Sequence, residues 1–156
     1  MPADRLRVGA RVILFLALAP LITACGGDGP AGPPPAELPG LWVAIESEFV
    51  LRSSPSERVE IVALGGAVIL GLRRDGSFFL SLTLPGEPRP WGREGTWISE
   101  GDVLRLEFDS GGQQEFDMDW RDDILRLTKG HVLFDFGTGR PEEAEWNLRL
   151  VKQASP

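Results

Sequence analysis

From residue 40 onward, apolar and polar residues alternate with a period of two, which predicts strands with one buried face rather than helices. The alternation is clearest over 77–84, where every second residue is a large apolar one. Similar runs recur along the chain and are separated by short stretches rich in Gly, Pro and Asp, which favour turns. We therefore expect strands over 41–51, 67–72, 77–84, 95–98, 103–108, 115–120, 124–128, 132–136 and 146–150.

The segment after the first strand is ambiguous. Ser54-Pro55-Ser56-Glu57 is typical of a helix N-terminus, with proline at the first helical position and glutamate three residues after the cap. However, Val59, Ile61 and Val62 are β-branched and favour a strand. We expect a turn followed by a strand here.

Tight turns such as Asp75-Gly76 make successive strands antiparallel neighbours. We therefore expect an all-β fold, an antiparallel up-and-down meander of about eight to ten short strands. A meander of this length usually closes into a barrel, because closure removes the free edges. A β-sandwich is the alternative.

The inward-facing rows of this barrel are expected to be bulky. On the first strand they are Leu41, Val43, Ile45, Phe49 and Leu51, with Ala44, Glu46 and Glu48 facing solvent. On later strands they include Phe78, Phe108, Phe116, Trp120, Phe134, Phe136 and Trp146. Eight strands enclose a space that side chains can fill or that can hold one small ligand, so both outcomes stay open. The candidates for a ligand pocket are Trp42, Phe78, Phe116, Trp120, Phe134 and Trp146.

The first 25 residues have the organisation of an export signal. Three arginines precede an apolar segment over 12–24, which is too short to span a bilayer as a helix and contains Pro20. The segment ends at Cys25, the only cysteine, and Leu21-Ile22-Thr23-Ala24-Cys25 resembles the bacterial lipobox. The resemblance implies cleavage before Cys25 and attachment of diacylglycerol and acyl chains such as palmitate to that residue. With Gly26 rather than Asp after the cysteine, it also implies an outer-membrane lipoprotein that faces the periplasm.

The stretch 26–40 is expected to be a spacer. Ten of its fifteen residues are Gly or Pro, so it cannot bury apolar surface. Its reach as an extended polyproline chain is at most roughly 45 Å. The predicted organisation is therefore a signal peptide over 1–24, a lipidated cysteine with a flexible linker over 25–40, and a barrel domain over 41–152.

Three short motifs resemble the bacterial lipocalin-like domain. They are Gly40-Leu41-Trp42, the hairpin Leu72-Arg73-Arg74-Asp75-Gly76-Ser77-Phe78, and Gly95-Thr96-Trp97 followed by Gly101-Asp102-Val103-Leu104-Arg105-Leu106. This resemblance implies a non-catalytic barrel that binds a small apolar ligand or an envelope protein. The alternative is a structural or interaction lipoprotein with a filled core and an exposed apolar patch, for which Phe79 on the solvent face of its strand is the candidate.

Charge and the remaining motifs narrow the function further. Without residues 1–24 the chain has 13 basic and 22 acidic residues, a net charge of −9, which argues against nucleic acid as a partner. His131 is the only histidine, so a multi-histidine metal site is excluded. A Ser-His-Asp triad would have to use this residue. The alternating Glu115, Asp117 and Asp119 are expected to be a solvated strand face. We expect no enzyme activity and no cofactor.

Overall fold

The computed structural model describes residues 36–154 and contains nine strands and no helix in that range, as the sequence pattern predicts. The strands are β1 (Gly40–Leu51), β2 (Arg58–Glu60), β3 (Ala67–Leu72), β4 (Ser77–Thr83), β5 (Trp91–Glu100), β6 (Val103–Phe108), β7 (Gln113–Arg121), β8 (Ile124–Phe134) and β9 (Glu142–Lys152). The described residues accordingly include no helix of the length and apolarity needed to cross a membrane. The predicted signal segment, Cys25 and most of the linker lie outside them.

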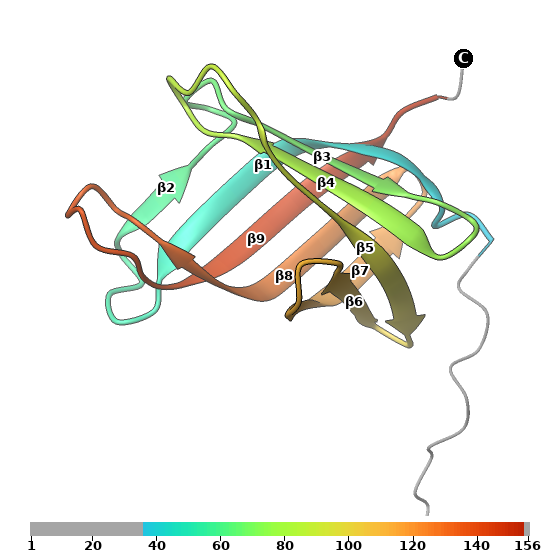
Figure 1. Ribbon diagram of the computed structural model, residues 1–156. Coiled ribbons are helices and arrows are strands. Elements are labelled where there is room, and N and C mark those ends of the chain that lie inside the picture. Colours follow the sequence, from blue (N-terminus) through green and yellow to red (C-terminus); the bar gives the residue numbers. More distant parts are fainter. Residues whose placement is uncertain (1–35, 155–156) are drawn as a thin grey trace, which may run out of the picture.

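Eight of the strands form a closed antiparallel barrel, and β2 is a ninth strand attached to β1 (Figure 1). From β3 to β9, each strand pairs with the next along the chain. The ring closes at β1, which pairs with β3 through residues 40–43 and with β9 through residues 42–51. The up-and-down meander is thus confirmed and the sandwich is excluded. Every pairing that closes the barrel lies within 36–154, so we expect this segment to fold on its own.

The barrel has two different ends. At one end, here called the closed end, lie the turns 73–76, 101–102 and 122–123 and both ends of the described chain. Backbone hydrogen bonds join these parts, for example from Lys152 N to Asp123 O at 2.9 Å. At the opposite end, here called the mouth, lie the loops 52–57, 84–90, 109–112 and 135–141 (Figure 1).

A residue of the predicted linker seals the closed end. Leu38 is fully buried, and its carbonyl oxygen accepts a hydrogen bond of 2.9 Å from the indole Nε1 of buried Trp42. Lys152 lies over the Trp42 ring and contacts the carbonyl of Glu37. The folded part therefore begins before residue 41, because a leucine and an indole bury each other there.

Side chains fill the barrel from the closed end to its middle. The residues at most 1% exposed there are Trp42, Leu70, Phe78, Leu104, Leu106, Leu125, Leu127 and Leu150. They come from six of the eight barrel strands, as inward rows of a small barrel should. This half of the barrel is a packed core.

The predicted inward row of β1 is wrong over its first half. Leu41 and Ile45 are each 42% exposed and Val43 is only half-buried, whereas Trp42 and Ala44 face the core. The register with β9 shifts between Ala44 and Glu46, so Ile45 is the extra residue of a β-bulge. A bulge reverses the facing of every later residue, and Phe49 and Leu51 are therefore buried as predicted.

A second bulge corrects the prediction of two strands around Lys129-Gly130. The structure has one strand, β8, whose register with β9 shifts between Leu127 and Gly130. Lys129 has a φ of 61°, a left-handed conformation that the bulge accommodates without a turn. β5, β8 and β9 each have ten residues or more and are longer than predicted.

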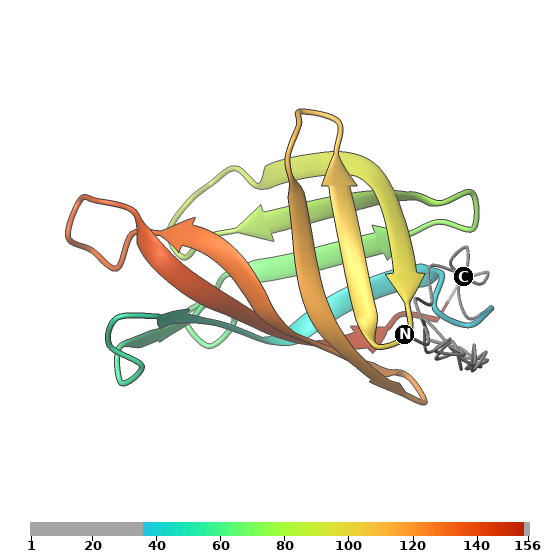
Figure 2. The ribbon, with the colours of Figure 1, turned by 90° about the horizontal axis from the view of Figure 1, so that it is seen from below.

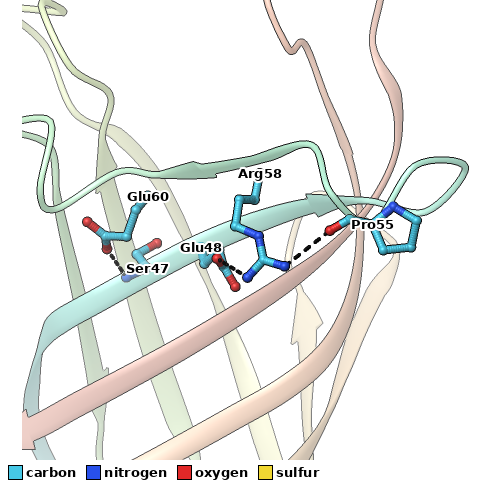
Figure 3. Close-up of polar contacts among 5 residues, drawn as sticks. All are labelled: Ser47, Glu48, Pro55, Arg58 and Glu60. Carbon is cyan, nitrogen blue, oxygen red and sulfur yellow. Dashed lines mark hydrogen bonds and ion pairs between the residues drawn. The ribbon is translucent and has the colours of Figure 1, made fainter.

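The ambiguous segment forms a turn and a short strand, β2, which polar contacts hold against β1 (Figure 3). The Glu60 carboxylate accepts a hydrogen bond of 2.6 Å from Ser47 N. The Arg58 guanidinium donates to Glu48 and to the carbonyl of Pro55, both at 3.2 Å. These contacts hold the second half of β1, beyond Val43, where its pairing with β3 stops.

The outer wall includes Phe79, the predicted centre of an exposed patch. A Cβ at Gly71 would lie 2.0 Å from the Phe79 ring, so that ring covers the glycine backbone on the neighbouring strand. The Arg73 guanidinium lies 5.5 Å from the same ring. Phe79 is only partly exposed and belongs to the wall; the most exposed large apolar side chains are Leu41, Ile45, Leu64, Trp91 and Leu133.

Candidate functional site

At the mouth the packed core gives way to an apolar cleft of about 420 Å³ that opens to solvent. One wall comes from the ends of β1, β8 and β9, and the other comes from β4 and β5. The lining side chains are Phe49, Leu82, Leu84, Trp91, Val132, Leu133, Phe134, Asp135, Pro141 and Trp146. A cleft of this size and apolarity lies in the usual range for small ligands, about 300–1,000 Å³.

A stack of three aromatic rings forms the first wall. The rings of Phe49 and Phe134 are nearly parallel with centroids 4.2 Å apart, and those of Phe49 and Trp146 are 5.3 Å apart at 17°. Phe136 meets Phe134 edge-on at 5.1 Å. Phe49 and Trp146 are opposite each other in the β1–β9 register, so the sheet itself places the stack.

Ser47 holds this wall in place and was missed by sequence reasoning. It is fully buried, and its Oγ accepts a hydrogen bond of 3.0 Å from the indole Nε1 of Trp146. Its backbone N donates to the Glu60 carboxylate at the end of β2, and its backbone O accepts from Ile61 N, the next residue. The indole nitrogen is thus satisfied inside the barrel, which leaves the ring's apolar surface for the cleft. Position 47 falls on the predicted inward row between Ile45 and Phe49, but a serine gives no apolar signal that would mark it as a core residue.

The cleft exists because two strands extend beyond their neighbours. The register of β5 with β6 starts at Gly95, and beyond a hydrogen bond from Asp109 N to Glu94 O the first three residues of β5 have no partner in β6. The register of β8 with β7 ends at Thr128, so the last residues of β8 pair with β9 alone. Figure 2 shows the β6–β7 and β8–β9 hairpins diverging from this point. The barrel wall is therefore split at the mouth.

An ion pair lies where the split begins. Lys129 Nζ on β8 and Asp117 Oδ2 on β7 are 2.5 Å apart. The hydrogen bond to Asp117 and its negative charge raise the pKa of the Lys129 ammonium. Beyond it, exposed His131 Nδ1 and the Arg52 guanidinium are 3.0 Å apart. These polar contacts lie on the outer surface, and Glu115, Asp117 and Asp119 are exposed as predicted.

The structure places the six predicted pocket residues in three groups. Phe134 and Trp146 line the cleft. Trp42, Phe78 and Phe116 are at most 2% exposed and belong to the packed core, where the Phe116 ring also covers Gly130. Trp120 is half-buried on β7 and does not line the cleft. Sequence reasoning missed the opposite wall, formed by Leu82, Leu84 and Trp91.

Other grooves on the described part of the chain are more polar. One of about 530 Å³, here called the outer groove, runs over β4, β5 and the start of the loop 109–112. Its lining residues are Phe79, Leu80, Ser81, Gly92, Arg93, Glu94, Asp109 and Ser110. Within residues 36–154, no three His, Cys, Asp or Glu side chains gather in a way that could hold a metal ion. The cleft at the mouth is the concave apolar site of the described barrel.

Comparison of the chain with models of known protein families finds no match, and comparison with curated proteins finds none either.

Proposed function

We propose that this protein is a lipid-anchored lipoprotein of the bacterial cell envelope whose barrel binds the apolar part of a small molecule in the cleft at its mouth. The proposal that the barrel binds a ligand rests on the cleft, because about 420 Å³ of apolar space is open to solvent beside a wall of stacked aromatic rings. The anchoring half is supported by the lipobox-like residues that end at Cys25. No catalytic step and no cofactor are part of the proposal.

The geometry of the barrel fits an anchor at its N-terminal side. The chain enters at the closed end, through Leu38 and β1, and the cleft is at the opposite end. A lipid attached before residue 36 would therefore leave the cleft accessible from the periplasm. The spacer would keep the acidic barrel clear of anionic headgroups.

Binding is tested with N-phenyl-1-naphthylamine, an apolar uncharged dye that fluoresces in a dry environment. We expect residues 36–154 to bind it with saturation, and Leu82→Glu to weaken binding at least tenfold, because the new carboxylate must be desolvated in the cleft. Ile45→Glu is the matched control, since Ile45 is 42% exposed on the outer wall. Equal dye binding by the two variants contradicts the assignment of the cleft.

The anchor is tested by fractionating cells that produce the full chain or its Cys25→Ser variant. We expect the unaltered protein in the membrane pellet and in the detergent phase, and the variant in the soluble fraction. Acyl chains supply the affinity in this account, at about 0.8 kcal/mol per buried CH₂, and the acidic barrel adds none. A variant that still pellets with membranes argues against lipid anchoring.

The alternative is an interaction lipoprotein that uses the mouth as a protein-binding surface. Leu133, 71% exposed beside the cleft, is the observation that favours it. Leu133 also lines the cleft, but its side chain is much more exposed than that of Leu82. The two functions are therefore separated by comparing two variants. Leu82→Glu should weaken dye binding more than Leu133→Asp does, whereas Leu133→Asp should weaken binding of a protein partner more than Leu82→Glu does.

A further inference from the structure

Arg93 is an arginine on the inner face of the barrel at the mouth. In the β4–β5 register it lies directly opposite Leu80, and Trp91 lies opposite Leu82. Residues opposite each other in an antiparallel pair share a face, and Leu80 is only 3% exposed in the core. Arg93 and Trp91 therefore extend the inward row of β5, although one of them carries a charge.

The Arg93 guanidinium rests on a residue of the cleft. Its central carbon is 4.2 Å from the centroid of the Trp91 ring, a close cation–π contact, and Trp91 lines the cleft. Its only hydrogen bond within the described residues goes from Nη1 to the carbonyl of Gly92, at 3.2 Å. Arg93 itself lines the adjoining outer groove, so its charge lies beside the cleft, on the ring of Trp91, with most of its five N–H donors unused.

No carboxylate forms an ion pair with this charge. Among residues 36–154, none lies within 4 Å of the Arg93 guanidinium, although Glu94 and Asp109 line the same groove. Four other arginines of the wall have a carboxylate at 3.3 Å or less, namely Arg58, Arg105, Arg121 and Arg149. The adjacent Glu94 lies opposite Phe79 and so belongs to the outer face. A planar cation with free donors beside an apolar cleft matches the geometry of a carboxylate, sulfate or phosphate ester.

We propose that the cleft selects amphiphiles with a single anionic head, which Arg93 binds at the rim while the apolar tail lies between Leu82 and the aromatic stack. This inference rests on the proposed function and adds the chemical class of the ligand. Arg93 is then the residue that determines specificity, and Trp91 holds its guanidinium in place.

A purely structural role for Arg93 makes a different prediction. The start of β5 is an unpaired sheet edge, and a charge on such an edge can prevent aggregation. That role would make variants aggregate but would leave the ratio of affinities for charged and neutral ligands unchanged. The ratio is therefore the informative quantity.

The test uses residues 36–154 and three ligands with the same tail: decyl sulfate, decanol and decyltrimethylammonium, all below their micelle concentrations. Each is titrated against the bound naphthylamine dye, and its dissociation constant follows from displacement. The proteins are the unaltered barrel, Arg93→Gln, Arg93→Lys and the control Arg74→Gln, which removes one exposed arginine at the closed end.

We expect the unaltered barrel and Arg74→Gln to bind decyl sulfate about tenfold more tightly than decanol, a modest value for a hydrogen bond to a charged group. Decyltrimethylammonium should bind most weakly. Arg93→Gln should reduce the sulfate-to-decanol ratio to about one, and Arg93→Lys should leave an intermediate ratio, because lysine keeps the charge and loses the planar fork.

Two results would overturn the inference, and they can be told apart. Equal displacement by all three ligands, with dye binding intact, contradicts anion selection and leaves the cleft as a site for apolar groups. The same sulfate preference in Arg93→Gln also contradicts it, because the anion then binds elsewhere. Failure of the dye itself to bind would remove the proposed function and this inference together.

Discussion

Gly95→Ala is expected to destabilise the barrel by at least about 3 kcal/mol, the upper part of the range for overpacked sites. A Cβ at Gly95 would lie 1.9 Å from the carbonyl oxygen of Glu107 and 3.0 Å from Cα of Phe108. Both atoms belong to the backbone of β6, so no side chain can move aside, and the two strands would have to separate. The glycine thus permits the close approach at which β5 bends between β4 and β6.

The measurement is urea unfolding followed by tryptophan fluorescence. A loss of this size is a large part of the 5–15 kcal/mol by which domains are usually stable, so the midpoint should fall steeply or the variant should not fold. Gly92→Ala is the matched control on the same strand, because its Cβ would meet only Leu80 O at 3.9 Å. We expect it to change stability by less than about 0.5 kcal/mol. Similar midpoints for the two variants would contradict the β5–β6 geometry.

Trp42→Ala is the second substitution with a large expected effect, a loss of about 3–5 kcal/mol. Trp42 is fully buried at the closed end, and its indole nitrogen holds the carbonyl of Leu38 at 2.9 Å. Removing the ring leaves a cavity and frees the segment before β1. Besides the lower urea midpoint, hydrogen exchange at residues 38–41 should become faster.

Trp91→Ala removes the same side chain from the mouth, where it is 43% exposed, and should cost less than about 1.5 kcal/mol. This contrast distinguishes a filled closed end from an evenly packed barrel. A cost for Trp42→Ala no larger than that for Trp91→Ala would mean that the closed half is not the packed core described above.

The strand count and the meander could be predicted because each hairpin is encoded locally. The run 77–84 and the turn Asp75-Gly76 need no information from distant residues. The prediction of β1 failed because the facing of its residues depends on a distant strand. Leu41, Val43 and Ile45 read as one buried row, and only the pairing with β9 reveals that Ile45 is bulged and that Trp42 and Ala44 face the core.

The prediction of a turn in β8 was wrong because it relied on the glycine at position 130. Lys129-Gly130 has the composition of a turn, but the chain uses Lys129 in a left-handed conformation to continue the strand. Gly130 is needed because the Phe116 ring occupies the position of its absent side chain. That contact spans 14 positions in the sequence and is invisible to a local pattern.

Only part of the cleft could be found from the sequence. An alternating pattern indicates which side chains face inward, and it named Phe134 and Trp146 correctly as inward residues. It does not indicate how far along the barrel each residue lies, because that depends on where neighbouring strands end. Phe78 and Leu82 belong to the same inward row of β4, yet one is in the packed core and the other lines the cleft.

The central claim is that the mouth of a half-filled barrel is the binding site, and amide chemical-shift mapping tests it most directly. Residues 36–154, labelled with ¹⁵N, are titrated with the naphthylamine dye. The account predicts that the largest shifts lie at Leu82, Trp91 and 132–134, with none at the core around Trp42. Shifts centred instead on the outer groove at Ser81 and Ser110, or their absence at saturating dye, would contradict it.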